Sequence, residues 1–194
     1  MASLSDFVVS KVRVKLLKTF LANPKEMYHV RGLVRQTSEE INAVRRELRR
    51  MEEAGMVQKE GRGNRLYYWF RKDYGFFDEL LRLIAKTTGL GFEIKQNRGK
   101  LGKVSFVMFS NEFVRRAERK NNDQIDVLVV GDIVLPELAN LVRQEETARG
   151  TEINYSPMTK DEFEFRKSRR DPFILGILTG GRILIIGDEQ EFVS

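Results

Sequence analysis

The stretch Leu48–Asp73, LRRMEEAGMVQKEGRGNRLYYWFRKD, decides the fold of the first half of this chain. It begins as the end of a charged helix and passes through Gly55, a residue suited to the left-handed position beyond a helix. Met56–Glu60 and Arg65–Arg71 then have the composition of two strands, joined by the tight, basic tip Gly61-Arg62-Gly63-Asn64. The stretch therefore predicts a helix followed by a β-hairpin.

Three helices are expected before this hairpin. Apolar residues at helical spacing indicate the first over Asp6–Leu21. A short extended piece, Met27–Val30, then leads to a second, brief helix. Thr37 and Glu40 fit a capping box, so we expect the third helix from about Ser38 to Ala54.

The third helix is expected to have two different faces. At about 100° per residue, one stripe is apolar and can pack against a core, and its members are Ile41, Val44, Leu48 and Met51. The free side begins at Ser38 and is polar and basic; it carries Asn42, Arg46 and Arg49, with Arg45 and Arg50 flanking them. The alternative is a solvated face on which the arginines pair with Glu47, Glu52 and Glu53 at helical spacing.

Charge is divided unevenly between the two halves of the chain. Residues 1–98 contain 20 Lys+Arg against 12 Asp+Glu, whereas residues 99–194 contain 14 against 16. Together with the Gly-rich, basic stretch Arg98–Lys103, this predicts two domains, 1–98 and 99–194. A domain with such a basic excess is a candidate for a polyanionic partner, most often nucleic acid.

With three helices followed by a hairpin, Met27–Lys72 resembles the winged helix-turn-helix of ArsR-like and related bacterial and archaeal transcription regulators. The resemblance implies sequence-specific binding of double-stranded DNA, with the third helix in the major groove. Asn42 would then read adenine, and an arginine such as Arg46 or Arg49 would read guanine. In that family, helices that flank the winged helix pair two subunits, so the apolar helix expected over Tyr74–Lys86 predicts a homodimer.

The same resemblance gives roles to the remaining basic residues. Arg62 and Arg65, on or beside the hairpin tip, would reach phosphate or the minor groove. Ser38 suits a phosphate contact at the start of the third helix, and Arg45 flanks the reading face. Alternate members of the aromatic run Tyr67–Phe70 are expected to point into the core, which we favour over stacking on unpaired bases.

The second half reads as a small α/β domain. Short apolar runs predict strands at Val104–Phe109, Ile125–Val130, Glu152–Tyr155 and Ile183–Ile186. Helices are expected between them at Leu135–Arg149, Thr159–Arg166 and Pro172–Leu178. The predicted fold class is therefore α+β, with an N-terminal winged helix-turn-helix domain followed by a small α/β domain that has a mixed sheet.

The segments SFVMFSNEFVRRAERKNNDQIDVLVVGD, TEINYSPMTKDEF and DPFILGILTGGRILIIGD resemble the small nucleotidyltransferases of the DNA polymerase beta superfamily. That family has a Gly-Ser pair, an Asp-x-Asp pair and a third carboxylate, which hold the nucleotide phosphates and two metal ions. Here Phe109-Ser110, Gln124-Ile125-Asp126 and Asn154 stand at those places. Two amides replace two carboxylates, so we expect a degenerate domain with no catalytic residues, metal or cofactor.

Composition excludes several classes of site and of protein. The chain has no cysteine and one histidine, His29, which is expected to be structural. No run is long and apolar enough for a membrane span, so we expect a cytoplasmic protein without a membrane partner. The leading hypothesis is a dimeric DNA-binding transcription regulator whose effector is unknown. The alternatives are an active nucleotidyltransferase with an altered metal site and an antitoxin-like interaction module.

Overall fold

The computed structural model describes residues 8–119 and 124–194 and has a mixed α+β fold with two small sheets. The chain forms two compact units, which divide between Thr87 and Thr88. The sequence predicted this division at residues 98 and 99. The structure places it earlier because helix α5 (Gly89–Gln96) packs against α7 (Leu135–Arg149) of the second unit.

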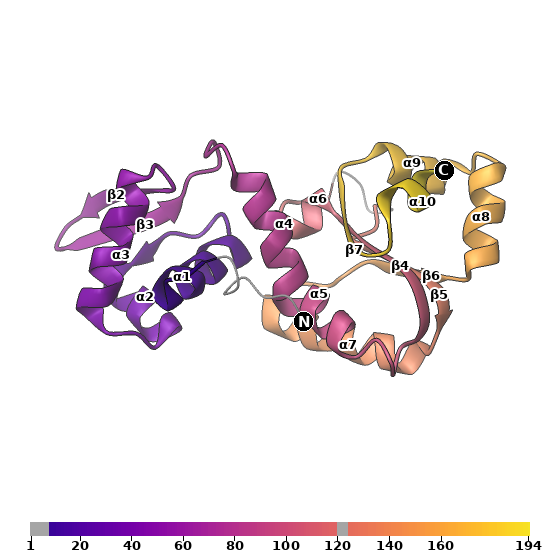
Figure 1. Cartoon of the computed structure of the whole chain (residues 1–194), viewed down its shortest axis with the longest axis horizontal. Coiled ribbons are helices and arrows are strands. Elements are labelled where there is room, and N and C mark those ends of the chain that lie inside the picture. The colour runs from indigo at the N-terminus through magenta and orange to yellow at the C-terminus, as the bar shows by residue number, and fades with distance from the viewer. Residues whose placement is uncertain (1–7, 120–123) are drawn as a thin grey trace. The chain divides into compact units, whose positions relative to one another are not determined.

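From residue 8 onward, the first unit contains four helices and a three-stranded antiparallel sheet of order β1-β3-β2. Its elements are α1 (Lys11–Ala22), β1 (Tyr28–His29), α2 (Val30–Thr37), α3 (Ile41–Glu53), β2 (Val57–Arg62), β3 (Arg65–Phe70) and α4 (Phe77–Thr87). Figure 1 shows α3 beside the β2–β3 hairpin. The helices and the hairpin therefore follow in the predicted order, with the Arg62–Arg65 tip closing the hairpin.

Helix α1 begins later than its apolar pattern predicts. Residues 8–10 are not helical, and the hydroxyl of Ser10 accepts a hydrogen bond from the backbone N–H of Arg13. This N-cap satisfies a donor that the first turn leaves open, so the helix starts at Lys11. The predicted start at Asp6 lies outside the described residues.

The turn between α2 and α3 corrects the predicted capping box. Thr37 belongs to the end of α2, where its hydroxyl donates to the carbonyl of Leu33 at 2.7 Å. Ser38 follows in the left-handed region, with φ of 53°. Glu40 is the cap, because its carboxylate accepts the backbone N–H groups of Asn42 and Ala43, both at 2.9 Å. Helix α3 therefore begins at Ile41 and not at Ser38.

Strand β3 supplies the sheet's contribution to the first core. Tyr68 and Phe70 are buried, whereas Tyr67 and Trp69, which alternate with them, are half-buried. The Phe70 ring lies 6.4 Å from that of Phe20 in α1 and 6.0 Å from that of Phe77 in α4. The prediction that one alternate pair of the aromatic run serves the core is confirmed.

The second unit has a four-stranded mixed sheet of order β6-β5-β4-β7. β4 is antiparallel to β5 and β7, and β5 is parallel to β6. Besides α5 and α7, its elements are β4 (Gly102–Ser110), α6 (Asn111–Val114), β5 (Val127–Ile133), β6 (Tyr155–Met158), α8 (Lys160–Ser168), α9 (Pro172–Thr179), β7 (Arg182–Ile186) and α10 (Glu189–Val193). β5 and β6 both begin later than predicted, so Asp126 and Asn154 lie just before the strands.

Helices cover the second sheet from two sides. Figure 1 shows α9 and α10 on one side and α5 and α7 on the other. The first side contains a cluster in which Phe163 of α8, Ile174 of α9 and Phe192 of α10 pack against the strands. Gly131 is required where β5 meets β4, because its φ is 147° and a Cβ there would lie 2.1 Å from the carbonyl oxygen of Lys103.

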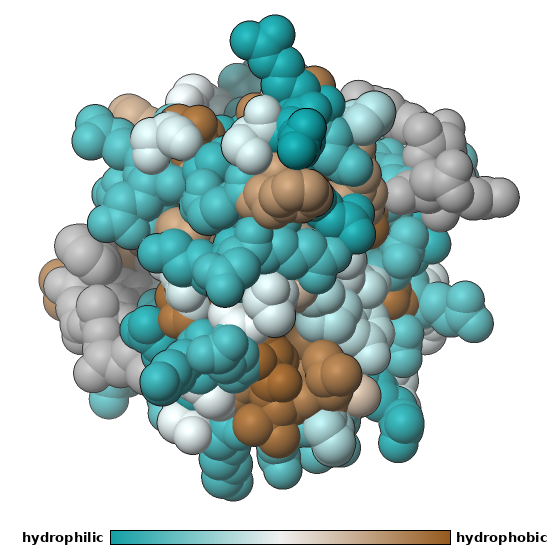
Figure 2. Space-filling view, turned by 90° about the vertical axis from the view of Figure 1, so that its right-hand side faces the viewer, coloured by the Kyte–Doolittle hydropathy of each residue, from teal (hydrophilic) through white to brown (hydrophobic). Residues whose placement is uncertain are grey.

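One face of the second unit is mostly polar. Figure 2 shows largely hydrophilic side chains, interrupted by an apolar patch. The exposed large apolar residues of this unit include Val134, Leu135 and Phe165. Across residues 8–119 and 124–194, no helix has the length and hydropathy needed to cross a bilayer.

Candidate functional site

Helix α3 separates a packing face from an exposed face. Val44, Leu48 and Met51 are buried in the core of the first unit. The four helical residues that the sequence assigns to DNA are all exposed, and they are Asn42, Arg45, Arg46 and Arg49. One side of α3 thus presents an amide and three guanidinium groups to solvent.

Few carboxylates neutralise this exposed face. Arg49 forms an i,i+4 pair with Glu53 at 3.7 Å, a long and exposed contact of small energetic value. Within the described part of the chain, Arg45 and Arg46 have no carboxylate at ion-pair distance. The alternative, in which Glu47, Glu52 and Glu53 pair with all the arginines of a solvated face, therefore holds only in part. Arg49 is paired, whereas Arg45 and Arg46 are not paired with any described carboxylate.

Glu40, at the start of α3, is the acidic group of this region. The backbone N–H of Asn42 holds the pKa of Glu40 below its ordinary value. The N–H of Ala43 and the positive charges of Arg46 and Arg45 act in the same direction. Glu40 is therefore an ionised cap that fixes the position at which the arginine face begins.

Glu47 is the residue of α3 whose place the sequence did not predict. Its side chain is buried and accepts from Arg13 Nε of α1 at 2.5 Å and from the Ser10 hydroxyl at 3.1 Å. At about 100° per residue, Glu47 lies beside Met51 at one edge of the packing stripe, and that position is the sequence signal for its burial. The contact ties α3 to the start of α1.

The hairpin tip carries two further basic residues. Arg62 and Arg65 are exposed and face each other across β2 and β3. Arg62 Nη2 donates a hydrogen bond to the Glu60 carboxylate at 3.1 Å. The Arg62 guanidinium carbon lies 5.7 Å from the centre of the Tyr67 ring. Ser38, the remaining residue assigned to DNA, is exposed in the α2–α3 turn and not in the first turn of α3.

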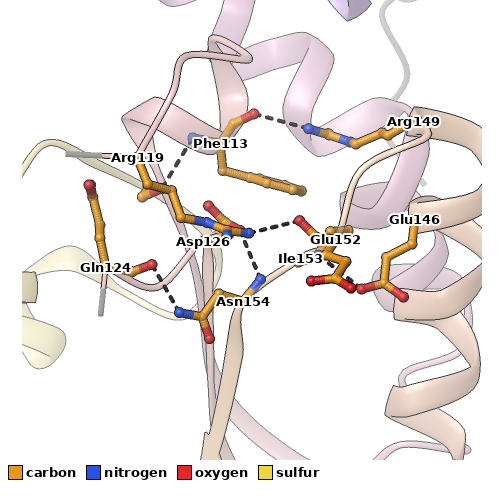
Figure 3. A network of polar contacts seen from close by, with 10 residues as sticks. Phe113, Arg119, Gln124, Asp126, Glu146, Arg149, Glu152, Ile153 and Asn154 are labelled. Carbon is orange, nitrogen blue, oxygen red and sulfur yellow. Dashed lines mark hydrogen bonds and ion pairs between the residues drawn. The ribbon is translucent and has the colours of Figure 1, made fainter. Parts of the chain in front are cut away.

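A second polar site lies in the second unit, where three strands meet irregular chain. Ser110 ends β4, and its N–H donates to the carbonyl of Asp126 at 2.9 Å. The N–H of Asp126 donates to the carbonyl of Asn154 at 2.7 Å, and the Asn154 amide donates to the carbonyl of Gln124 at 3.1 Å. The structure therefore brings together all four residues that the sequence placed in the degenerate site, as Figure 3 shows for three of them.

Asp126 is held in this site through one carboxylate oxygen, Oδ2. Its buried carboxylate accepts from Arg119 Nη2 at 2.5 Å, from Arg119 Nε at 3.0 Å and from the backbone N–H of Asn154 at 2.9 Å (Figure 3). The hydrogen bond to Asp126 raises the pKa of the Arg119 guanidinium further above its ordinary value. Sequence reasoning missed Arg119, which lies in irregular chain without a periodic signal.

This arrangement does not suit a metal pair. Oδ2 of Asp126 accepts from the Arg119 guanidinium, and the neighbouring Gln124 and Asn154 bring neutral amides. In the described parts of the chain, no three His, Cys, Asp or Glu side chains converge as they would around a metal ion. Ser110 is also occupied, because its hydroxyl accepts the N–H of Phe113 and caps α6.

The remaining contacts of Figure 3 hold the chain around this site. Arg149 of α7 donates to the carbonyl of Phe113 at 3.0 Å, and its guanidinium lies 3.8 Å from the centre of the Phe113 ring. Glu146 of α7 accepts the backbone N–H of Ile153 at 2.9 Å. These contacts join α7 to α6 and to the segment before β6. Arg149 and Glu146 therefore stabilise the fold around the site.

No protein-family model, curated protein or solved structure matches this chain.

Proposed function

We propose that this protein binds double-stranded DNA in a sequence-specific manner through its first unit and acts as a transcription regulator. The observation that carries the proposal is the exposed face of α3, where Asn42, Arg45, Arg46 and Arg49 lie beside a hairpin with Arg62 and Arg65 at its tip. Three helices followed by this hairpin support a winged helix-turn-helix. Such a unit places one helix in the major groove and the hairpin on the adjacent backbone.

The side chains suit different parts of the duplex. Asn42 can form two hydrogen bonds with an adenine edge, and Arg46 or Arg49 can do so with guanine. Arg62 and Arg65 suit phosphate oxygens, which position the protein but carry no sequence information. Arg45 and Ser38, on either side of the reading residues, suit the same backbone role.

For the second unit we propose a nucleotidyltransferase-like frame that does not catalyse transfer. The mixed sheet and the grouping of Ser110, Gln124, Asp126 and Asn154 support the frame. The Arg119–Asp126 ion pair and the two amides argue against catalysis. The unit would then serve the regulator as a rigid interaction module.

We propose a homodimer as the binding species. α4 supports this role because it follows the hairpin, and Phe76, directly before it, is 64% exposed. A symmetric dimer would bind half-sites about 10 base pairs apart, or a multiple of that spacing.

The test is selection of genomic duplex fragments by the purified protein, followed by affinity measurements on the enriched site and its single-base variants. Arg46→Ala or Arg49→Ala should cost about 1–3 kcal/mol and relax preference at one base pair. Arg62→Ala should weaken all duplexes alike. Arg143→Ala, an exposed arginine of α7 in the second unit, is the matched control and should bind as wild type.

Two results would contradict the proposal. Retention of DNA without any enriched motif would reduce the interface to nonspecific electrostatics. Transfer of labelled nucleotide with magnesium or manganese that disappears in Asp126→Ala would establish the enzyme instead.

A further inference from the structure

The outer face of the first sheet, opposite the core, presents two aromatic rings of β3. Tyr67 and Trp69 occupy this face, since Tyr68 and Phe70 point inward. β1 pairs with β3 only at Tyr67 and Tyr68. Trp69 therefore has β2 on one side, where Gln58 is its partner, and no paired strand on the other.

A hollow of about 470 Å³ lies beside Trp69. Pro24 and Met27 give it apolar walls, while Trp69 contributes an aromatic surface. A volume of this size accommodates a small planar group, such as one heterocyclic base.

Basic side chains outnumber acidic ones around this hollow, and Arg62, which also lines it, is paired with Glu60 at 3.1 Å. Lys25 and Lys72 line it and are exposed, and within the described residues neither has a carboxylate at ion-pair distance. Arg71 also lines it, but Asp73 holds its guanidinium through two hydrogen bonds, at 3.0 and 2.5 Å. The two lysines are therefore the cations whose charge is available to a ligand.

An aromatic surface with uncompensated cations beside it fits a ligand that is both planar and anionic. Unpaired nucleotides have this chemistry, because a base can stack on the indole while its phosphates meet the ammonium groups. The bases of a duplex are stacked on one another and cannot reach Trp69. An acidic peptide would satisfy the lysines but would leave the indole without a planar partner.

We propose that this hollow binds a short single-stranded stretch of nucleic acid, with one base stacked on Trp69 and the adjacent phosphates beside Lys25 and Lys72. This activity goes beyond duplex recognition by α3. It uses the outer face of the first sheet. Arg62 of the hairpin tip also lines the hollow but is paired with Glu60, so the phosphates are assigned to Lys25 and Lys72.

The experiment uses the fluorescence of the full-length protein, in which Trp69 is the only tryptophan. Adding an oligothymidylate of about twelve nucleotides should quench this fluorescence saturably, and the affinity should fall with added salt. In anisotropy measurements with a labelled oligonucleotide, Trp69→Ala should raise the Kd about 5- to 150-fold. Trp69→Phe, which keeps a ring in the sheet, should have an intermediate effect.

Lysine variants test the phosphate contacts without altering the ring. Lys25→Ala combined with Lys72→Ala should weaken oligothymidylate binding and flatten its salt dependence. Lys11→Ala, an exposed lysine of α1 outside the hollow, is the matched control and should leave both unchanged. Arg46→Ala separates the two proposals, because it should alter duplex selectivity and leave the quenching intact.

Two outcomes would overturn the inference. In the first, oligothymidylate binds without quenching Trp69 and binds equally well to Trp69→Phe and to the double lysine variant. That result would place the strand elsewhere on the protein. Polyglutamate that binds at the hollow as tightly as the oligonucleotide would identify an acidic peptide as the ligand.

Discussion

Glu47 is a buried carboxylate whose partners come from the preceding helix. Its side chain is 4% exposed, and it pairs with Arg13 at 2.5 Å. Removing such a group leaves a half-buried guanidinium and the Ser10 hydroxyl without their acceptor. The stability of the first unit therefore depends on the Glu47 carboxylate, although Glu47 stands among arginines in the sequence.

We expect Glu47→Ala to lower the free energy of unfolding of the first unit by about 2–3 kcal/mol. Urea titration followed by Trp69 fluorescence measures this unit, because Trp69 lies in β3. Glu53→Ala removes an exposed carboxylate that meets Arg49 at 3.7 Å and should change the free energy by less than about 0.5 kcal/mol. Equal effects from the two variants would show that the Glu47 contacts are not stabilising.

Glu40 predicts a dependence of stability on pH. Its pKa in the folded protein is lowered, so its contribution to stability is complete above the ordinary pKa near 4.5. This contribution decreases as the pH falls and is lost once the pH passes below the lowered pKa. Glu40→Gln should therefore be less stable than wild type at pH 7 and should approach it at low pH.

The measurement is a pair of urea titrations, at pH 7 and at pH 3.5, for wild type and Glu40→Gln. Glu53→Gln is the control, since Glu53 is an exposed carboxylate in the last turn of α3 and not at its cap. A stability difference between wild type and Glu40→Gln that stays constant with pH would mean that charge at the cap is unimportant.

At the scale of elements, strong local signals predicted the hairpin and α7. α7 has the predicted bounds, Leu135–Arg149, because Pro136 favours its first turn and Gly150 ends it in the left-handed region. The turn before α3 was not predictable in this way. Thr37 and Glu40 both have capping chemistry, and the Lys15 ammonium, which reaches the Thr37 carbonyl and Glu39 from α1, is a tertiary contact.

The sequence predicted which residues form the polar site of the second unit, but it did not predict the contacts of Asp126 within that site. A family resemblance singled out Ser110, Gln124, Asp126 and Asn154, and the structure brings them together. The periodicity of the sequence does not predict a role for Arg119, because this residue lies in irregular chain. Its guanidinium nonetheless decides what Asp126 can do, and only the three-dimensional arrangement reveals this.

The Arg119–Asp126 pair connects the ends of several elements and gives a prediction of its own. Arg119 also donates to the carbonyl of Glu152 at 2.7 Å, so it joins the start of β5 to the segment before β6. Arg119→Ala leaves a buried carboxylate without its cation and should destabilise the second unit by about 2–4 kcal/mol. Thermal unfolding followed by circular dichroism measures the loss.

Magnesium supplies the control for this variant. If the carboxylate of Asp126 served a metal ion, millimolar magnesium would restore the stability of Arg119→Ala. We expect no restoration, since the amides of Gln124 and Asn154 add no negative charge. Arg143→Ala, which removes an exposed arginine of α7, tests whether the loss is specific to the ion pair.

At the scale of the whole molecule, charge is concentrated in the first unit. The chain up to Thr87 contains 18 Lys+Arg against 11 Asp+Glu, and the chain from Thr88 contains 16 against 17. The long-range attraction of DNA should therefore come from the first unit, while the second adds almost no net charge.

This asymmetry predicts how duplex affinity responds to salt. If Arg45, Arg62 and Arg65 each neutralise one phosphate, the slope of log K against log salt concentration should be about −3 per protomer. Arg65→Ala should reduce its magnitude by about 1, because one fewer counterion is released. Lys160→Ala, an exposed lysine of the second unit, should leave the slope unchanged. A slope that responds to Lys160→Ala and not to Arg65→Ala would transfer the phosphate contacts to the second unit.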